Sequence, residues 1–177
     1  MTQTPKARDD HVVSQFQIRF ATPADAPMIA AHRVGMWRDM GDLPDEFAEP
    51  LRERAVAQFG DAIARNEYVG WLAAPADDAD KIIAGAGVLL RDSLPSPRKV
   101  NGQTVGVTQG KLGLLINVFT EPEWRRRGVA MQLMQRVVEW SREQPLDRLV
   151  LHASGAGRPL YEKMGFVATN EMRLADL

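Results

Sequence analysis

The spacing of apolar residues changes from segment to segment, and these changes predict alternating strands and helices. Apolar and polar residues alternate over Phe16–Phe20, which predicts a strand, and the apolar run over 112–119 predicts a strand covered on both faces. From Ala130 the apolar residues recur at helical spacing and form one stripe. The other predicted elements are helices over 22–40, 45–64 and 158–164, and strands over 68–73, 82–90, 149–153 and within 166–174.

Several element ends carry their own signals. Thr22-Pro23-Ala24-Asp25 supplies a capping hydroxyl, a proline and a first-turn acid, so it predicts a helix start, and Gly41 predicts its end. Gly85 and Gly87 indicate a bulge in their strand. The segment 91–110 holds two prolines and three glycines without a clear period, which indicates either a functional loop or partial disorder.

The order of elements predicts an α/β fold of the α+β kind, with a mixed central sheet flanked by helices. The first strands are joined by short connections and should pair antiparallel, whereas strands 112–119 and 149–153 flank a helix and should be parallel. We expect residues 1–14 to form a disordered leader, because they are polar and lack the apolar core of a signal peptide. Residues 15–177 then form a single domain.

Composition narrows the classes of function. The formal net charge of −1 gives no general attraction to nucleic acid or to a membrane surface, and no apolar run is long enough to span a bilayer. The chain has no cysteine, so it has no thiolate metal site and no cysteine to carry an acyl-enzyme intermediate. No His, Asp and Glu residues have metal-ligand spacing, so we expect no metal. These features predict a cytoplasmic protein.

The turn between strand 112–119 and the following helix is suited to an anion. Three arginines, Arg125 to Arg127, precede Gly128 there. The first turn of a helix has backbone N–H groups without intrahelical partners, and the helix dipole favours negative charge beside them. Gly128 has no Cβ, so a ligand can approach the backbone closely. The turn therefore predicts a diphosphate site.

Two motifs resemble those of the GNAT (GCN5-related) N-acetyltransferases. Arg125-x-x-Gly128-x-Ala130 matches the R/Q-x-x-G-x-G/A signature with which that family binds acetyl-CoA. Leu160-Tyr161-Glu162-Lys163-Met164-Gly165-Phe166 looks like its L-Y-E-K-x-G-F landmark, in the family's order and at a normal separation. The resemblance covers roughly 16–174. It implies a GNAT fold whose sheet is splayed between strands 112–119 and 149–153, where the pantetheine arm of CoA lies.

The resemblance also implies a set of cofactor-binding positions. The backbone amide of Val118 or of a neighbour would polarise the thioester carbonyl, and Asn117 would either face the acetyl group or bond within the splay. Ser154 stands where the family often has an asparagine that bonds to CoA, so that contact should be weaker or remade by other groups. The implied acetyl-CoA-binding residues are Asn117, Val118, Phe119, Thr120, Arg125, Arg126, Arg127, Gly128, Val129, Ala130, Met131 and Ser154.

Candidate catalytic residues follow from the chemistry of acetyl transfer, which needs an acid for the leaving thiolate and a base for the amine. Tyr161 occupies the family's usual position for the acid, and the alternative is a tyrosine that only packs in the core. Glu171 is the first candidate base, and the alternative is a solvated carboxylate. The other candidate bases, none fixed by the family, are Asp39, Asp42 and His152.

The resemblance implies an N-acetyltransferase that passes the acetyl group directly from acetyl-CoA to a primary amine in a ternary complex. The acceptor would be a small-molecule or peptide amine, with no nucleic-acid or membrane partner and a possible homodimer. One alternative is a non-catalytic acyl-CoA-binding regulatory module. Another is a different nucleotide-binding turn, which is disfavoured because neither G-x-x-x-x-G-K-S/T nor G-x-G-x-x-G occurs at the turn.

Overall fold

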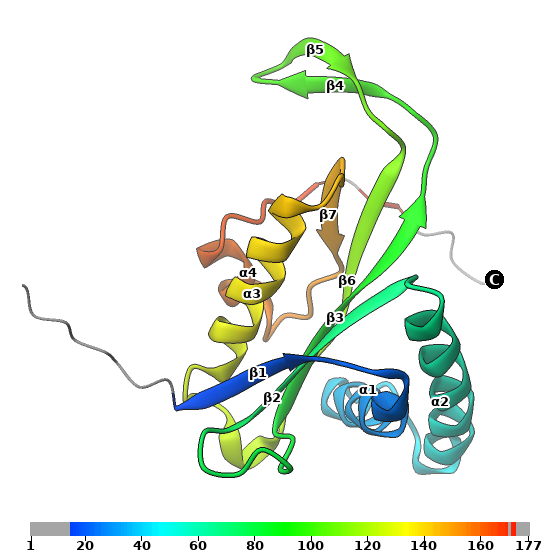
Figure 1. The fold of residues 1–177 in the computed structure, drawn as a ribbon, viewed down its shortest axis with the longest axis vertical. Coiled ribbons are helices and arrows are strands. Elements are labelled where there is room, and N and C mark those ends of the chain that lie inside the picture. The colour runs from blue at the N-terminus through cyan, green and yellow to red at the C-terminus, as the bar shows by residue number, and fades with distance from the viewer. Residues whose placement is uncertain (1–14, 170, 173–177) are drawn as a thin grey trace, which may run out of the picture.

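A computed structural model describes residues 15–169, 171 and 172 of the 177-residue chain. Its central sheet has the strand order β1-β2-β3-β6-β7, with antiparallel pairing except between the parallel β6 and β7 (Figure 1). This arrangement confirms the predicted mixed sheet. The strands are β1 (Phe16–Phe20), β2 (Tyr68–Pro75), β3 (Ala84–Asp92), β6 (Lys111–Thr120) and β7 (Arg148–Leu151).

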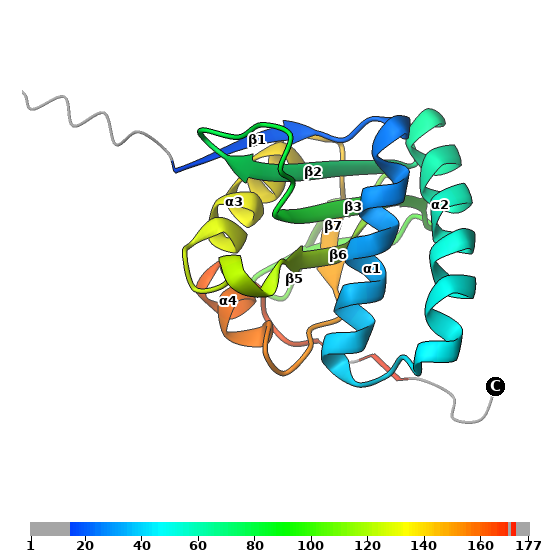
Figure 2. The same ribbon diagram turned by 90° about the horizontal axis from the view of Figure 1, so that it is seen from below.

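Helices cover both faces of this sheet. Figure 2 shows α1 and α2 on one face and α3 and α4 on the other. Short 3₁₀ turns stand directly before α1 and α2, at Pro23–Asp25 and Asp45–Phe47. A third 3₁₀ turn, Pro122–Trp124, lies between β6 and α3. The helices are α1 (Ala26–Met40), α2 (Ala48–Ala64), α3 (Val129–Glu143) and α4 (Arg158–Lys163).

The core lies on both sides of the sheet, as the apolar stripes predict. On the α3 side Leu133, Met134 and Val137 are fully buried, and on the α1 side Ile29 and Leu72 are buried. Burying one such side chain contributes about 1.5–3 kcal/mol relative to leaving it in water. These two layers hold β3 and β6 rigidly between the helices.

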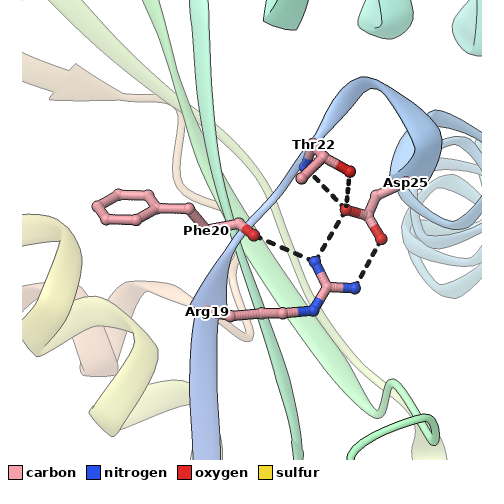
Figure 3. Close-up of polar contacts among 4 residues, drawn as sticks. All are labelled: Arg19, Phe20, Thr22 and Asp25. Carbon is pink, nitrogen blue, oxygen red and sulfur yellow. Dashed lines mark hydrogen bonds and ion pairs between the residues drawn. The ribbon is translucent and has the colours of Figure 1, made fainter.

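The start of α1 is fixed by a network around Asp25 (Figure 3). Arg19 donates to both carboxylate oxygens of Asp25, at 2.8 and 2.7 Å, and the backbone N–H and hydroxyl of Thr22 donate at 2.7 and 2.9 Å. The Arg19 hydrogen bonds are the main reason why the pKa of Asp25 lies well below its usual range. The predicted helix start is confirmed, and Gly41 ends α1 with φ of 78°.

The segment 91–110 is more ordered than its sequence indicated. It contains a two-stranded hairpin of β4 (Pro97–Val100) and β5 (Gln103–Val107), which extends beyond the ends of β3 and β6 (Figure 1). Asn101 and Gly102 form its turn with φ of 49° and 80°. Asn-Gly is a strong hairpin signal because both turn positions need positive φ. Partial disorder is therefore the wrong alternative for this segment, and a functional role for it stays a prediction.

The prediction of a strand within 166–174 is wrong for the described residues of that segment. Residues 166–169, 171 and 172 contain no strand. Val167 is 81% exposed and Met172 is 95% exposed, so these apolar side chains do not share a buried face of the kind that holds a strand on a core. The predicted leader over 1–14 lies outside the described residues.

Candidate functional site

A bulge in β6 forms the centre of the site. Gly85 of β3 pairs with Phe119 and Gly87 pairs with Ile116, so one residue of β3 lies opposite two of β6, Asn117 and Val118. The predicted irregularity at these glycines is confirmed, but the extra residue belongs to β6. A bulge leaves backbone groups out of the ladder. These are the groups from which a donor to the thioester carbonyl was expected.

Asn117 has an unusual backbone and an incompletely satisfied side chain. Its φ is 59°, a conformation that few non-glycine residues adopt and that is often found at functional sites. The side chain is 3% exposed, and its Nδ2 donates to the carbonyl of Ile29 at 3.0 Å. Its Oδ1 has no hydrogen-bond partner among the described residues. Asn117 thus fastens the bulge to α1 and does not bond across to β7.

The strands β6 and β7 separate just before the bulge of β6. Their parallel pairing runs from Leu112 with Arg148 to Leu115 with Leu151 and ends there, although β6 continues to Thr120. A cleft of about 1450 Å³ occupies the opening, and it is lined by residues 116–120 of β6 and 151–157 after β7. The predicted splay of the sheet is therefore present, and the unpaired strand edges face this cleft.

The turn before α3 has a left-handed backbone and open space beside it. Gly128 adopts φ of 86° and immediately precedes the first residue of α3, and Arg126 also has positive φ, 61°. A Cβ built on Gly128 would meet no protein atom within 4 Å, so the space beside this backbone is open. Val129 is buried in the core and Ala130 lines the cleft, whereas Met131 is half-buried outside the lining. Val129 can therefore serve a ligand only through its backbone N–H.

The three arginines of the turn have different surroundings. Arg125 lines the cleft, where its guanidinium pairs with Asp39 and its Nε donates to the carbonyl of Thr120 at 2.9 Å. Arg127 lies 4.8 Å above the ring of Trp124, outside the cleft lining. Arg126 is exposed and has no side-chain partner among the described residues. The structure thus brings only Arg125 of the three to the cleft.

Tyr161 lies on the opposite wall of the opening, on α4. It is half-buried, and burial raises the pKa of its phenol, so the hydroxyl stays protonated at neutral pH. Its ring packs edge-on against Phe166, with 6.0 Å between the ring centroids. No hydrogen bond of its hydroxyl to a described residue is present. Tyr161 therefore packs against Phe166 and also lines the cleft.

Ser154 also lines the cleft, but its side chain is already used. Its Oγ accepts from the backbone N–H of Gly157 at 3.2 Å, and its carbonyl accepts from the N–H groups of Gly157 and Arg158. These bonds organise the turn that leads into α4. Ser154 thus helps to position Tyr161, in addition to facing the place expected for CoA.

The candidate bases fall into two groups. His152 lines the cleft, and its Nε2 lies 2.8 Å from a carboxylate oxygen of Glu171, which is exposed and outside the lining. Asp39 lines the cleft but is paired with Arg125, and Asp42 is exposed outside the lining. Glu171 therefore reaches the cleft only through His152, an arrangement that the sequence did not predict.

The sequence did not single out four further arginines, which line the cleft on the side of α1 and α2. Arg54 and Gln58 of α2, and Arg65 directly after it, follow helical spacing beside the apolar stripe, and this polar row was the signal that could have found them. Two more come from α1 and β3. Besides Arg125, the lining arginines are therefore Arg33, Arg54, Arg65 and Arg91.

Residues 15–169, 171 and 172 lack two kinds of feature. This part of the chain contains no group of three or more His, Asp or Glu side chains that could hold a metal ion. No helix within it is long and apolar enough to cross a bilayer.

Comparison with known proteins identifies relatives of this fold and site. The family model described as the acetyltransferase (GNAT) family matches residues 36–166. An aminoglycoside N(6')-acetyltransferase type 1 from Stenotrophomonas maltophilia is 30% identical over 132 residues, which are 75% of this chain and 71% of that protein.

Solved structures agree with this match. A GCN5-related N-acetyltransferase from Ralstonia eutropha JMP134 superposes with a TM-score of 0.77 at 25% identity, over 91% of this chain and 98% of that one. A predicted acetyltransferase from Clostridium acetobutylicum, solved with acetyl-CoA, gives a TM-score of 0.71 at 28% identity, over 91% and 96% of the two chains.

Proposed function

The chain belongs to the acetyltransferase (GNAT) family, and from this premise we propose that it transfers an acetyl group from acetyl-CoA directly to a primary amine while both substrates are bound. The observation that carries the proposal is the opening of the sheet beyond Leu115 and Leu151. There the bulge of β6 and Tyr161 of α4 line one cleft. A second solved relative was determined with acetyl-CoA, which supports this co-substrate.

CoA would lie along the separated strands, with its diphosphate at the first turn of α3. The open space beside Gly128 supports this placement, as do the backbone N–H groups that begin α3. The pantetheine amides would bond to the unpaired edge of residues 116–120. Among the expected CoA-binding residues, Arg125 and Ser154 line the cleft and would contact CoA through their side chains. The other expected residues would contact it through their backbone.

The proposed reaction uses groups that line this cleft, together with Glu171, which contacts the lining residue His152. The neutral amine nitrogen attacks the thioester carbonyl carbon, and a C–N bond forms while the oxygen takes the negative charge. Backbone N–H groups at Asn117 and Val118 would stabilise that charge. The C–S bond then breaks, the amine loses a proton, and the leaving thiolate accepts a proton from the Tyr161 hydroxyl.

We propose that Glu171 acts as base through His152. The 2.8 Å contact between His152 Nε2 and the Glu171 carboxylate orients the imidazole. The imidazole lines the cleft and can take the amine proton directly or through one water molecule. Asp39 is less suited because its carboxylate is already paired with the guanidinium of Arg125.

The acceptor proposed here is a small-molecule amine. The relative from Stenotrophomonas maltophilia, whose name includes an aminoglycoside, supports this choice over a peptide. A non-catalytic acyl-CoA-binding module is the alternative, and the acetyltransferase relatives favour the enzyme. The cytoplasmic location and the homodimer stay predictions.

An acceptor screen separates these functions. The protein is mixed with acetyl-CoA and a panel of amines, and both free CoA thiol and acetylated amines are measured by mass spectrometry. Thiol release matched by an acetylated amine supports the transferase. Binding of CoA without release on any amine supports the module.

A further inference from the structure

The cleft continues past β6 to the face covered by α1 and α2, and its lining there is basic. Arginines reach it from α1 (Arg33), α2 (Arg54), the residue directly after α2 (Arg65) and β3 (Arg91), in addition to Arg125 of the turn. The only lining carboxylates among the described residues are Asp39 and Asp61. The lining therefore has an excess of positive charge, although the whole chain has a net charge of −1.

Both lining carboxylates are already engaged by arginines. Asp39 pairs with Arg125, and Asp61 lies 3.9 Å from Arg65, which also pairs with Glu67 at 3.0 Å. Asp39 is thus compensated by Arg125, whereas Asp61 has only this longer contact. The charge that remains unbalanced in the cleft belongs to arginines.

Arg33, Arg54 and Arg91 have no carboxylate partner among the described residues. They come from three separate elements, α1, α2 and β3, and they line the same cleft. Arg54 and Arg91 are exposed and Arg33 is half-buried, so an anion bound in this part of the cleft would be attracted by all three. This cluster therefore has the character of a binding site for an anion.

Arg33 shows this most clearly, because it is half-buried. Its guanidinium lies 5.8 Å from the ring centroid of Trp37, a contact that compensates only part of its desolvation. Burial lowers the pKa of Arg33, as expected when a cation has lost water without gaining a carboxylate. An anionic oxygen of a ligand would restore the missing partner.

We propose that the acceptor is an amine that also carries an anionic oxygen group, a carboxylate or a phosphate, and that Arg33, Arg54 and Arg91 bind that group. This inference rests on the proposed acetyl transfer and names its acceptor class. Guanidinium groups match both anions by paired N–H donors. Apolar side chains of β3 and β6 (Leu89, Leu114 and Ile116) line the same region, which suits a short apolar linker between amine and anion.

The name of the Stenotrophomonas maltophilia relative suggests an aminoglycoside as acceptor. The charge of the cleft distinguishes that acceptor from an amine with an anionic group. An aminoglycoside carries several ammonium groups, and the unpaired arginines of this cleft would repel them. The acceptor of this chain therefore differs in charge from an aminoglycoside, although the fold and the reaction are shared.

The first test compares acceptors that share one linker. A linear diamine, the amino acid with a carboxylate in place of one amine, and the corresponding aminoalkyl phosphate are assayed beside an aminoglycoside. We expect kcat/KM for one or both anionic acceptors to exceed that for the diamine by on the order of 10- to 100-fold. Comparison of the carboxylate with the phosphate identifies which anion is preferred. Equal or faster acetylation of the diamine or the aminoglycoside would overturn the inference and leave the acetyltransferase intact.

The second test uses variants. Arg33→Gln, Arg54→Gln and Arg91→Gln should each raise KM for the better anionic acceptor by on the order of tenfold while changing KM for a neutral monoamine little. The control is Arg52→Gln on the same helix, since Arg52 pairs with Glu49 outside the cleft lining. If all three variants leave KM for the anionic acceptor unchanged, the inference is wrong.

A binding measurement keeps the two proposals separable. The thermal stabilisation given by the aminoalkyl phosphate or by the amino acid, with CoA present, is compared between the parent protein and the Arg33→Gln and Arg91→Gln variants. Arginine-dependent stabilisation without acetylation of any amine would retain the anion site and reject the transferase. Stabilisation by neither probe, or equal stabilisation in all variants, would reject the anion site.

Discussion

The guanidinium of Arg125 pairs with the carboxylate of Asp39, which joins the turn before α3 to the last turn of α1. The sequence indicated that Arg125 would be available to the phosphates of CoA. In the structure its charge is already compensated, so its attraction for a phosphate is reduced. The pair also links the turn expected to bind the diphosphate to α1, which lines the same cleft.

Asp39→Asn should therefore strengthen CoA binding at low salt. Without the aspartate the Arg125 charge is free, and an exposed pair of this kind is worth up to about 1 kcal/mol, or roughly fivefold in affinity. The affinity should also fall more steeply as salt rises, because exposed charges are screened. Calorimetric titration at several salt concentrations measures both effects, and Asp42→Asn, outside the cleft lining, is the control. Equal affinities and slopes in the two variants would mean that Arg125 does not meet a phosphate.

Gly128→Val should weaken CoA binding strongly while the protein stays folded. A side chain there meets no protein atom within 4 Å but enters the space that the diphosphate would use. The positive φ adds backbone strain of about 1–2 kcal/mol, which could also disturb the turn. Gly102→Val in the β4–β5 hairpin carries the same strain, with φ of 80° and no neighbour within 4 Å, and controls for it. Both variants should lose similar stability, and only Gly128→Val should lose CoA affinity; preserved affinity would place the diphosphate elsewhere.

His32 should make the fold less stable as the pH falls. It is 1% exposed, burial lowers its pKa from 6.5 to about 4, and Glu121 is too distant, at 3.8 Å, to hydrogen-bond to it. Between these two pH values the unfolded chain binds a proton that the folded chain does not. The free energy of unfolding should therefore decrease by about 3 kcal/mol as the pH falls from 6.5 to 4.

Urea unfolding at several pH values checks this contribution. His32→Leu should flatten the dependence over that window, whatever its effect at neutral pH. Leu72→Val, a core substitution without a titrating group, should leave the slope as in the parent protein. A slope that persists in His32→Leu would assign the pH dependence to other groups.

Tyr161→Phe should reduce turnover by on the order of 10²- to 10⁴-fold, the usual contribution of a general acid. Acetyl-CoA affinity should change little, because the lost interaction belongs mainly to the transition state. Burial keeps the phenol protonated, so the rate should not fall between neutral pH and pH ~10 through loss of this acid. Stopped-flow measurement of CoA release tests these expectations.

The chain offers a matched control for that variant, since its only other tyrosine is Tyr68. Tyr68 is buried between α2 and β3, where Gly87 leaves room for its hydroxyl, and it does not line the cleft. Tyr68→Phe should retain turnover within a few-fold. If Tyr161→Phe retains turnover as well, with chemistry limiting the rate, Tyr161 only packs and the thiolate takes its proton from water or substrate.

The elements that could be predicted were those with local signals. The helix start at Thr22 and the αL end at Gly41 follow from side-chain capping and backbone freedom, which depend on a few adjacent residues. The hairpin turn at Asn101 and Gly102 also had a local signal, which was missed among surrounding prolines and glycines. The irregularity at Gly85 and Gly87 was predicted, but assigning its extra residue to β6 requires the register between two strands.

The parts of the site that could not be predicted depend on pairs of residues distant in the chain. Asp39 and Arg125 are separated by 86 positions, and no local pattern indicates that they meet. The same holds for His152 and Glu171, and for the arginines that three different elements bring to the cleft. The sequence motifs were enough to single out the turn before α3 and Tyr161. The charged residues around them could be identified only once the fold was known.

The most direct test of the central claim, direct transfer from acetyl-CoA to a bound amine, uses acetyl-CoA labelled with a heavy isotope in its acetyl group. Mass spectrometry follows the amine, the released CoA and the intact protein together. We expect labelled amide and free CoA in equal amounts, and no label on the protein when acetyl-CoA is present alone. A labelled protein that passes its acetyl group to the amine, or CoA bound without acetylation of any amine, would contradict the account.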